Sequence, residues 1–270
     1  MGGKAGARDP TALDMLRLLL RAEAIRHDRH RAAFMASDDP EQVHQIRVAL
    51  RRMRALVRGF GDMLAPKTAR RLSALLRDEF RRFGPLRDAD VQAAMRVGAA
   101  GVEAARLRAE LRAALAAENA PSLKARIAAI LHDTPRAVGS GRRRRLAMAP
   151  AGLMASRALH ATWTGLLAFG PDPTALPPGD LHDFRKRAKD MRYLAEFLGG
   201  RFGGTPGKTE KRLARMQDAL GLVNDLHVMR QGASPALPED HRRREARALA
   251  KARKAWAKLR RTGPWWLAIT

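Results

Sequence analysis

Apolar residues recur every three or four positions along most of the chain, which is the period of an α-helix with one buried face. Leu, Ala and Arg dominate these segments, and all three are strong helix formers. The sequence lacks alternating apolar and polar runs bounded by Asn-Gly or Asp-Gly turns, which are typical of β-hairpins. The pattern predicts an all-α fold, with helices over about 11–35, 41–63, 66–83, 86–132 (interrupted near 98–101 and 119–121), 151–168, 181–199, 206–220, 222–231 and 239–261.

One segment between the predicted helices differs in composition. Residues 134–150 contain Gly139-Ser140-Gly141, followed directly by four arginines at 142–145. Glycine and serine favour turns, and a run of like charges favours a solvated segment. We therefore predict a basic linker at 134–150 between a first helical bundle at 11–133 and a second at 151–261.

Two parts of the chain repeat the same motif. VHQIRVALRRMRALV, from Val43, matches LHDFRKRAKDMRYLA, from Leu181, at an offset of 138 residues. Further along, GPLRDADV from Gly84 matches GLVNDLHV from Gly221, at an offset of 137. Two matches in the same order at nearly the same offset indicate an internal duplication, with each copy about half of the chain.

Within the motif, cations alternate with apolar residues at helical spacing. The first basic stripe follows steps of 3, 4, 3 and 4 residues and consists of His44, Arg47, Arg51, Arg54 and Arg58. The second basic stripe consists of His182, Arg185, Lys189 and Arg192. An apolar residue directly precedes each of these cations in both stripes, so each stripe is expected to border the core. Like charges at this spacing repel one another, and the stripes therefore predict an anionic ligand.

The net charge of the chain also indicates an anionic partner. Lys plus Arg is 52 and Asp plus Glu is 27, so the formal net charge is +25. An excess of this size favours a polyanionic partner over an ordinary small-molecule substrate. Arginine accounts for 42 of the 52 cations, and its forked guanidinium suits phosphate. Genomic base composition explains arginine over lysine, but not the excess of basic over acidic residues.

Several classes of protein and site are disfavoured by what the sequence lacks. It contains no cysteine, which excludes disulfides, thiolate metal sites and cysteine nucleophiles. No apolar run approaches the roughly 18 residues that span a bilayer, and the segment after Met1 has no apolar signal-peptide region. We expect a cytoplasmic protein without a membrane partner.

The pattern H-x-x-R-x-x-x-[RK]-x-x-R occurs twice, each time followed by G-x-x-x-D, and resembles the CHAD family, the conserved histidine α-helical domain. The resemblance covers about 11–261. It implies two four-helix bundles related by approximate two-fold symmetry, with the basic stripes lining a central cavity or pore. It also implies binding of inorganic polyphosphate and association with polyphosphate granules. The second copy departs from the first with Lys189 in place of Arg51 and Asp190 in place of Arg52. A glutamate-rich β-barrel segment, which would indicate an attached hydrolase domain, is missing.

Both stripes are candidate polyphosphate-binding sites. Further candidates are basic residues next to the stripes or on neighbouring helices: Lys186, Arg17, Arg21, Arg77, Arg81, Lys208, Lys211, Arg212 and Arg215. We interpret His44 and His182 as donors to phosphate oxygens, because each lies near a helix start, where backbone amides favour an anion. A hydrogen bond to a backbone carbonyl stays open for both. Asp88 and Asp225 are expected to cap helices or to orient arginines.

Two other functions remain as alternatives to polyphosphate binding. The net charge also fits an architectural nucleic-acid-binding protein, although aromatic residues are only 5% and no helix-turn-helix signature is evident. An enzyme that processes polyphosphate is disfavoured, because neither an acidic metal site nor a nucleophile–base pair stands out. We expect a binding protein without catalytic residues, metal or cofactor. Its expected partner is inorganic polyphosphate, with other polyanions and a homodimer left open.

Overall fold

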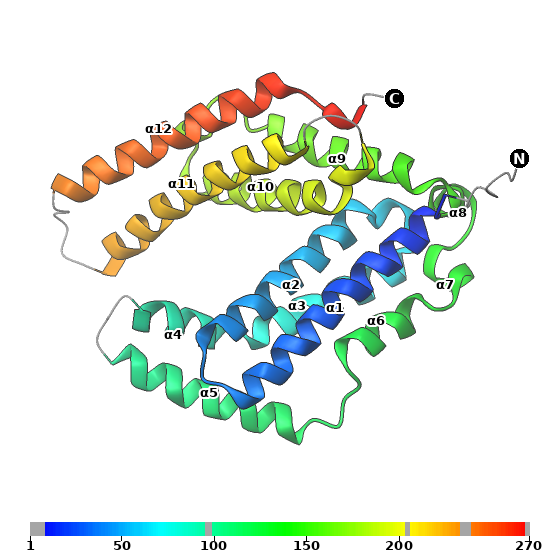
Figure 1. The fold of residues 1–270 in the computed structure, drawn as a ribbon, viewed down its shortest axis with the longest axis horizontal. Helices are drawn as coiled ribbons and strands as arrows, with labels where there is room; N and C mark the ends of the chain where they lie inside the picture. The colour runs from blue at the N-terminus through cyan, green and yellow to red at the C-terminus, as the bar shows by residue number, and fades with distance from the viewer. Residues whose placement is uncertain (1–8, 95–98, 203–205, 233–238, 268–270) are drawn as a thin grey trace, which may run out of the picture. The chain divides into compact units, whose positions relative to one another are not determined.

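The computed structural model describes residues 9–94, 99–202, 206–232 and 239–267, and every regular element in these ranges is a helix (Figure 1). The predicted all-α fold is therefore confirmed. The chain divides into two compact units, Met1–Met154 and Ala155–Thr270, which are described separately below.

The first unit contains a series of helices of very different length. In chain order they are α1 (Ala12–Ala36), α2 (Pro40–Gly59), α3 (Pro66–Arg82), α4 (Gly84–Ala94), α5 (Ala100–Ala117), α6 (Leu123–Leu131), α7 (Thr134–Val138) and α8 (Gly141–Met148), with a 3₁₀ turn at Gly61–Met63. The second unit is built from α9 (Ala151–Leu167, which begins just before the division), α10 (Pro178–Leu198), α11 (Pro206–Gly232) and α12 (Glu239–Thr262).

The two long helices at the start of the first unit have well-defined N-termini. Thr11 precedes α1 and accepts a hydrogen bond from the backbone amide of Asp14 through its hydroxyl (3.2 Å). Asp39 precedes α2 and accepts one from the amide of Glu41 (2.9 Å), and Pro40 occupies the first helical position. These side chains satisfy amides that lack a partner inside the helix. Asp39 and Pro40 therefore determine where α2, which carries the first copy of the repeated motif, begins.

The core of the first unit lies where α1 and α2 pack side by side (Figure 1). Leu16 and Leu20 of α1 and Ile46 and Leu50 of α2 are fully buried. Burial of such side chains contributes about 1.5–3 kcal/mol each. The apolar face of α2 is therefore held against α1, and the residues next to it border the core.

Aromatic side chains form the core of the second unit. Trp256 of α12 is fully buried, with its ring centroid 5.2 Å from that of Phe184 on α10 and 5.6 Å from that of Trp163 on α9. Its indole nitrogen donates a hydrogen bond to the carbonyl oxygen of Gly170 (3.0 Å). Edge-to-face aromatic pairs are favourable beyond the area that they bury. Trp256 therefore packs α12 against α10, the helix that carries the second copy of the repeated motif.

The predicted linker at 134–150 is wrong, because most of it forms α7 and α8. The backbone amide of Ala65 donates to the carbonyl oxygen of Ala137 (2.9 Å), and both Ala137 and Val138 are fully buried. Gly139 and Gly141 have φ values of +71° and +58°, which glycine adopts at little cost. They form a tight turn between two packed helices, whereas composition alone suggested a flexible segment.

The predicted break at Gly221 is also wrong, since α11 continues through it from Pro206 to Gly232. At the matching position of the first unit, α3 ends at Arg82 and α4 begins at Gly84. The reason is the next residue: Pro85 has no backbone N–H to continue the hydrogen-bond ladder, whereas Leu222 has one. The breaks expected at Gly98, Gly203–Gly204 and Ser234–Pro235 fall outside the described residues.

Candidate anion-binding site

The first basic stripe lies along α2 at the border of the core. The apolar residues that precede its first four cations are fully buried: Val43, Ile46, Leu50 and Met53. Arg47 is only 9% exposed, Arg51 and Arg54 are half-buried, and Arg58 is exposed in the last turn of the helix. The prediction that the stripe borders the core is therefore confirmed for α2.

Three arginines of this stripe gather around one aromatic ring. The guanidinium carbons of Arg47, Arg51 and Arg54 lie 3.9, 5.5 and 5.2 Å from the ring centroid of Phe80 on α3. The electron-rich face of a phenyl ring attracts cations, by about 0.5–2 kcal/mol for each contact. Phe80 therefore holds three like charges close together. We call these four residues the Phe80 cluster.

Arg47 is the most constrained cation of the cluster. Its Nη1 donates a hydrogen bond to the carbonyl oxygen of Phe80 (3.0 Å), in the last turn of α3. Its Nε is buried and has no hydrogen-bond partner. Burial, and then the charge of Arg51, lower the pKa of Arg47 to about 10. A nearby anion would therefore compensate a cation that the protein itself leaves poorly compensated.

His44 precedes the Phe80 cluster on the same stripe and is half-buried. Burial, followed by the charge of Arg87, lowers the pKa of His44 below 6.5. Its imidazole is therefore neutral at pH 7 and has one N–H to donate. α2 begins at Pro40, and so His44 lies beyond the first four residues, whose amides lack helical partners. The prediction that His44 lies beside these free amides is therefore wrong. The neighbouring arginines supply its positive environment instead.

The second basic stripe lies along α10, which begins at Pro178 rather than at the predicted 181. The apolar partners Phe184, Ala188 and Met191 are fully buried, as in the first unit. His182 is exposed, and Arg185 and Lys189 are half-buried. Burial and then the charge of Lys186 lower the pKa of His182. The stripe thus repeats the border position of the first one, with a more accessible histidine.

Carboxylates of α10 pair with cations in or beside the second stripe. Nζ of Lys186, beside the stripe, lies 2.9 Å from Oδ1 of Asp183. Within the stripe, Nη1 of Arg192 donates a hydrogen bond to Oε1 of Glu196 (3.1 Å). Arg192 also stacks on the ring of Tyr193, with its guanidinium carbon 4.9 Å from the centroid. Part of the positive charge of α10 is therefore neutralised within the helix.

Some predicted site residues lie apart from the stripes. Nε of Arg17 donates to the carbonyl oxygen of Leu131 (3.1 Å) and its Nη2 to the hydroxyl of Thr134 (2.9 Å), which satisfies the end of α6. Arg17 and Arg21 line a cavity of about 390 Å³ beside α6, together with Lys124. The contacts of Arg17 give it a structural role in the first unit.

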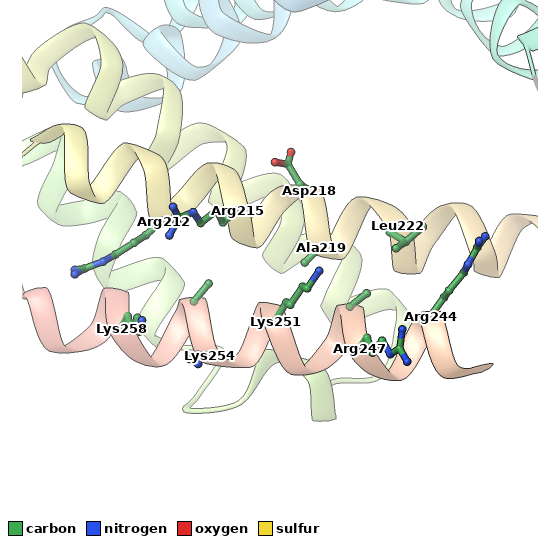
Figure 2. Close-up of a pocket in the computed structure, with 12 residues that line it drawn as sticks. Arg212, Arg215, Asp218, Ala219, Leu222, Arg244, Arg247, Lys251, Lys254 and Lys258 are labelled. Atoms are coloured by element: carbon green, nitrogen blue, oxygen red, sulfur yellow. The ribbon is translucent and has the colours of Figure 1, made fainter. Parts of the chain in front are cut away.

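The other predicted cations have different surroundings. Arg77 pairs with Asp78 (3.5 Å), and Arg81 is exposed at the end of α3. Lys208 and Lys211 are exposed on α11. Arg212 and Arg215 also lie on α11, where they line a groove of about 780 Å³ next to α12 (Figure 2). These two arginines therefore belong to the lining of the groove that α12 also borders.

The basic wall that α12 contributes to this groove is not among the site residues predicted from the sequence. The wall follows the same steps of 3, 4, 3 and 4 residues as the first basic stripe and consists of Arg244, Arg247, Lys251, Lys254 and Lys258. The spacing alone could have revealed it. Phe80, in contrast, has no such signal, because its place beside α2 depends on how α3 packs.

Asp88 and Asp225 are the matching acidic residues of the two G-x-x-x-D motifs, and the structure describes the side chain of Asp88. Asp88 is exposed on α4, and its charge raises the pKa of Arg47, against the larger lowering by burial. This electrostatic interaction is compatible with the expected role of orienting an arginine. The side chain of Asp225 lies outside the described residues.

The described residues offer neither a metal site nor a membrane-spanning helix. They contain no group of three or more His, Asp or Glu side chains suited to hold a metal ion. None of the helices described is both long and apolar enough to cross a membrane.

Comparisons with known proteins agree with this architecture. Residues 19–234 match the family model of the CHAD domain. The fold is similar to the crystal structure of the CHAD domain from the plant Ricinus communis, with a TM-score of 0.62 and 21% identity over 100% of this chain and 96% of that chain. It is also similar to PptA from Streptomyces chartreusis, with a TM-score of 0.56 and 16% identity over 92% of this chain and 99% of that chain. Among curated proteins no match was found.

Proposed function

We propose, from the premise that this chain belongs to the CHAD domain family, that it binds inorganic polyphosphate through its two basic stripes. The family resemblance implies this ligand and also association with polyphosphate granules, which we include in the proposal. The proposed activity is binding, without a catalytic step.

The observation that carries the proposal is the Phe80 cluster. Three guanidinium groups surround one ring, and the buried Nε of Arg47 has no partner. Gathering like charges at the edge of a core is unfavourable unless an anion meets them. A linear phosphate chain presents negative oxygens at short intervals and no bulky base, and thus suits several closely spaced arginine forks.

The second stripe supports a duplicated site. α2 and α10 both begin with proline, bury apolar residues at three matching positions (Ile46, Leu50 and Met53; Phe184, Ala188 and Met191) and place their cations at matching steps. We propose that both stripes descend from one duplicated motif and bind the same class of ligand. Within the second stripe, Arg192 pairs with Glu196, and an anionic ligand would compete with that carboxylate for the guanidinium group.

Charge reversal within the first stripe tests the proposal. Arg47 is a poor choice for this change, because its hydrogen bond to Phe80 links α2 to the end of α3. The more accessible pair Arg51→Glu with Arg54→Glu is expected to weaken binding of labelled long-chain polyphosphate at least about tenfold at near-physiological salt. Circular dichroism is expected to remain that of a helical protein.

A matched control reverses two charges elsewhere on the same unit. Arg70 and Arg71 are exposed near the start of α3, and Arg70→Glu with Arg71→Glu changes the net charge by the same amount. We expect this variant to bind within about twofold of the wild type. If the stripe variant binds as tightly as the control, the stripes are not the site. The pair Arg185→Glu with Lys189→Glu tests the second stripe in the same way.

A further inference from the structure

The groove between α11 and α12 has a strong excess of positive charge. Its lining includes seven cations and one carboxylate: Arg212, Arg215, Arg244, Arg247, Lys251, Lys254 and Lys258, with Asp218. Figure 2 shows Lys251 and Arg244 extending from α12 toward α11, while Asp218 points away from α12 in that view. The groove therefore has two cationic walls that the protein's own acid does not bridge.

Arg244, at the start of the α12 wall, pairs with Asp240 at 3.1 Å. In the part of the chain that the structure describes, the rest of this wall has no internal counter-charge, in contrast to α5 in the first unit. There, a buried ion pair of 2.7 Å joins Arg108 of α5 to Asp90 of α4, and Arg112 pairs with Asp38 at 2.7 Å. Among the described side chains, by contrast, no carboxylate lies within ion-pair distance of Arg247, Lys251 or the two lysines after it. The part of the wall from Arg247 to Lys258 is therefore open to an acidic partner.

The floor of the groove is apolar. It is formed by Ala219 and Leu222 of α11 and by Ala248 and Ala255 of α12. Leu222 is 43% exposed, although it is a large aliphatic residue on an otherwise charged surface. A phosphate chain has no apolar surface to place on this floor. Small alanines between two helices do allow the close approach of a third helix.

We propose that the groove binds an acidic amphipathic helix of a partner protein. Leucine-type side chains of that helix would cover Leu222 and the alanines, while glutamates or aspartates on both flanks would meet the cations of α11 and α12. The charged part of the α12 wall runs from Arg244 to Lys258, about 21 Å along a helix. A partner segment of about four turns matches this length. The inference is independent of polyphosphate binding by the stripes.

The test uses the full chain and a designed probe. The probe is a fluorescently labelled peptide of about 15 residues, with leucines at positions i, i+3, i+4 and i+7 and glutamates on the flanks. A scrambled peptide of the same composition has no apolar face and serves as the control ligand. Fluorescence anisotropy is expected to show at least about tenfold tighter binding of the amphipathic peptide.

Two variants separate the contributions of charge and apolar contact. Lys251→Glu with Lys254→Glu is expected to weaken binding of the amphipathic peptide at least about tenfold, while Arg70→Glu with Arg71→Glu leaves it within about twofold. Leu222→Gln keeps the net charge. It is expected to weaken binding of the amphipathic peptide about threefold to tenfold and to leave binding of labelled polyphosphate unchanged.

Three outcomes would overturn the proposal. Equal binding of the scrambled peptide would mean that the groove attracts any acidic chain. Unchanged peptide binding by Leu222→Gln would remove the role of the apolar floor. If the lysine reversals weaken polyphosphate binding but not peptide binding, the groove is a polyanion site instead.

Discussion

At the scale of single residues, Phe80 explains how the first stripe can concentrate charge. The ring contacts three guanidinium groups, and its backbone carbonyl accepts a hydrogen bond from the most buried of them. A side chain without charge therefore positions the cations of the proposed site.

Replacing this ring should loosen the cluster. Phe80→Leu keeps an apolar side chain and the backbone carbonyl but removes the aromatic face. We expect polyphosphate affinity to fall roughly tenfold to a hundredfold, because three cation–π contacts of about 0.5–1 kcal/mol each are lost together. Isothermal titration calorimetry measures the change. Phe80→Tyr retains the ring and should bind like the wild type; equal loss in both variants would contradict a role for the ring.

His44 should make polyphosphate binding depend on pH. Burial and the neighbouring arginines, Arg87 first among them, hold its pKa below 6.5 in the unbound protein. A bound anion raises that pKa, so binding takes up a proton, and affinity should increase as pH falls from 7.5 toward 5.5. Binding titrations across this range check the slope. His44→Gln should show a flatter dependence, and an unchanged slope would exclude His44 as its source.

A second histidine, His27, affects stability rather than binding. It is fully buried in α1. Its Nδ1 lies 3.0 Å from Oδ1 of Asp28, and its Nε2 lies 3.6 Å from Oε1 of Glu79. Burial lowers the pKa of His27, but the two carboxylates raise it above 6.5 overall. The same contacts lower the pKa values of Asp28 and Glu79, against the effect of burial. The charged cluster is therefore complete between the ordinary pKa values of Glu and His, at about 4.5–6.5.

Its stability contribution should be lost on both sides of this range. The part from His27 is present below pH 6.5 and disappears as pH rises through the raised pKa. The part from the carboxylates disappears as pH falls through their lowered values. In the wild type we expect the urea concentration at the unfolding midpoint to decrease as the pH rises from 5.5 to 8.5. His27→Asn should lower the free energy of unfolding by about 1–3 kcal/mol at pH 5.5. The midpoint of this variant should depend less on pH. A parallel profile in the variant would assign the pH dependence to other groups.

At the scale of elements, the periodicity of the sequence predicted most helices, because each long helix buries one face. The stripe positions followed from the same spacing. Two boundaries failed for local reasons that composition does not show. Residues 134–150 fold because Ala137 and Val138 reach the core, and α11 continues through Gly221 because a leucine follows it. The contact of Phe80 with α2 depends on tertiary packing and had no sequence signal.

The turn between α7 and α8 depends on glycine. Gly139 has φ +71° and ψ −144°, a conformation that residues with a Cβ atom rarely adopt. Gly139→Ala should cost about 1–3 kcal/mol of unfolding free energy, measured by urea denaturation. Gly61→Ala is the control, because an added Cβ meets nothing within 4 Å there. Equal stability of the two variants would mean that the turn relaxes without cost.

At the scale of the whole molecule, the net charge of +25 attracts any polyanion. Such attraction is strongly salt-dependent, because each phosphate contact releases counterions. Charge alone therefore does not distinguish polyphosphate from nucleic acid. The account instead assigns selectivity to arginines at the border of the core, where a thin chain without bases can approach them. The basic cavity between the two units stays a prediction, as does the two-fold relation of the bundles.

The most direct test of this account is a competition experiment. The full chain is titrated with labelled long-chain polyphosphate at near-physiological salt, and duplex DNA is then added at matched phosphate concentration. If the stripes select a thin, base-free chain, DNA fails to displace the label. Ready displacement by DNA would contradict the account, because the chain would then act as an unselective basic surface.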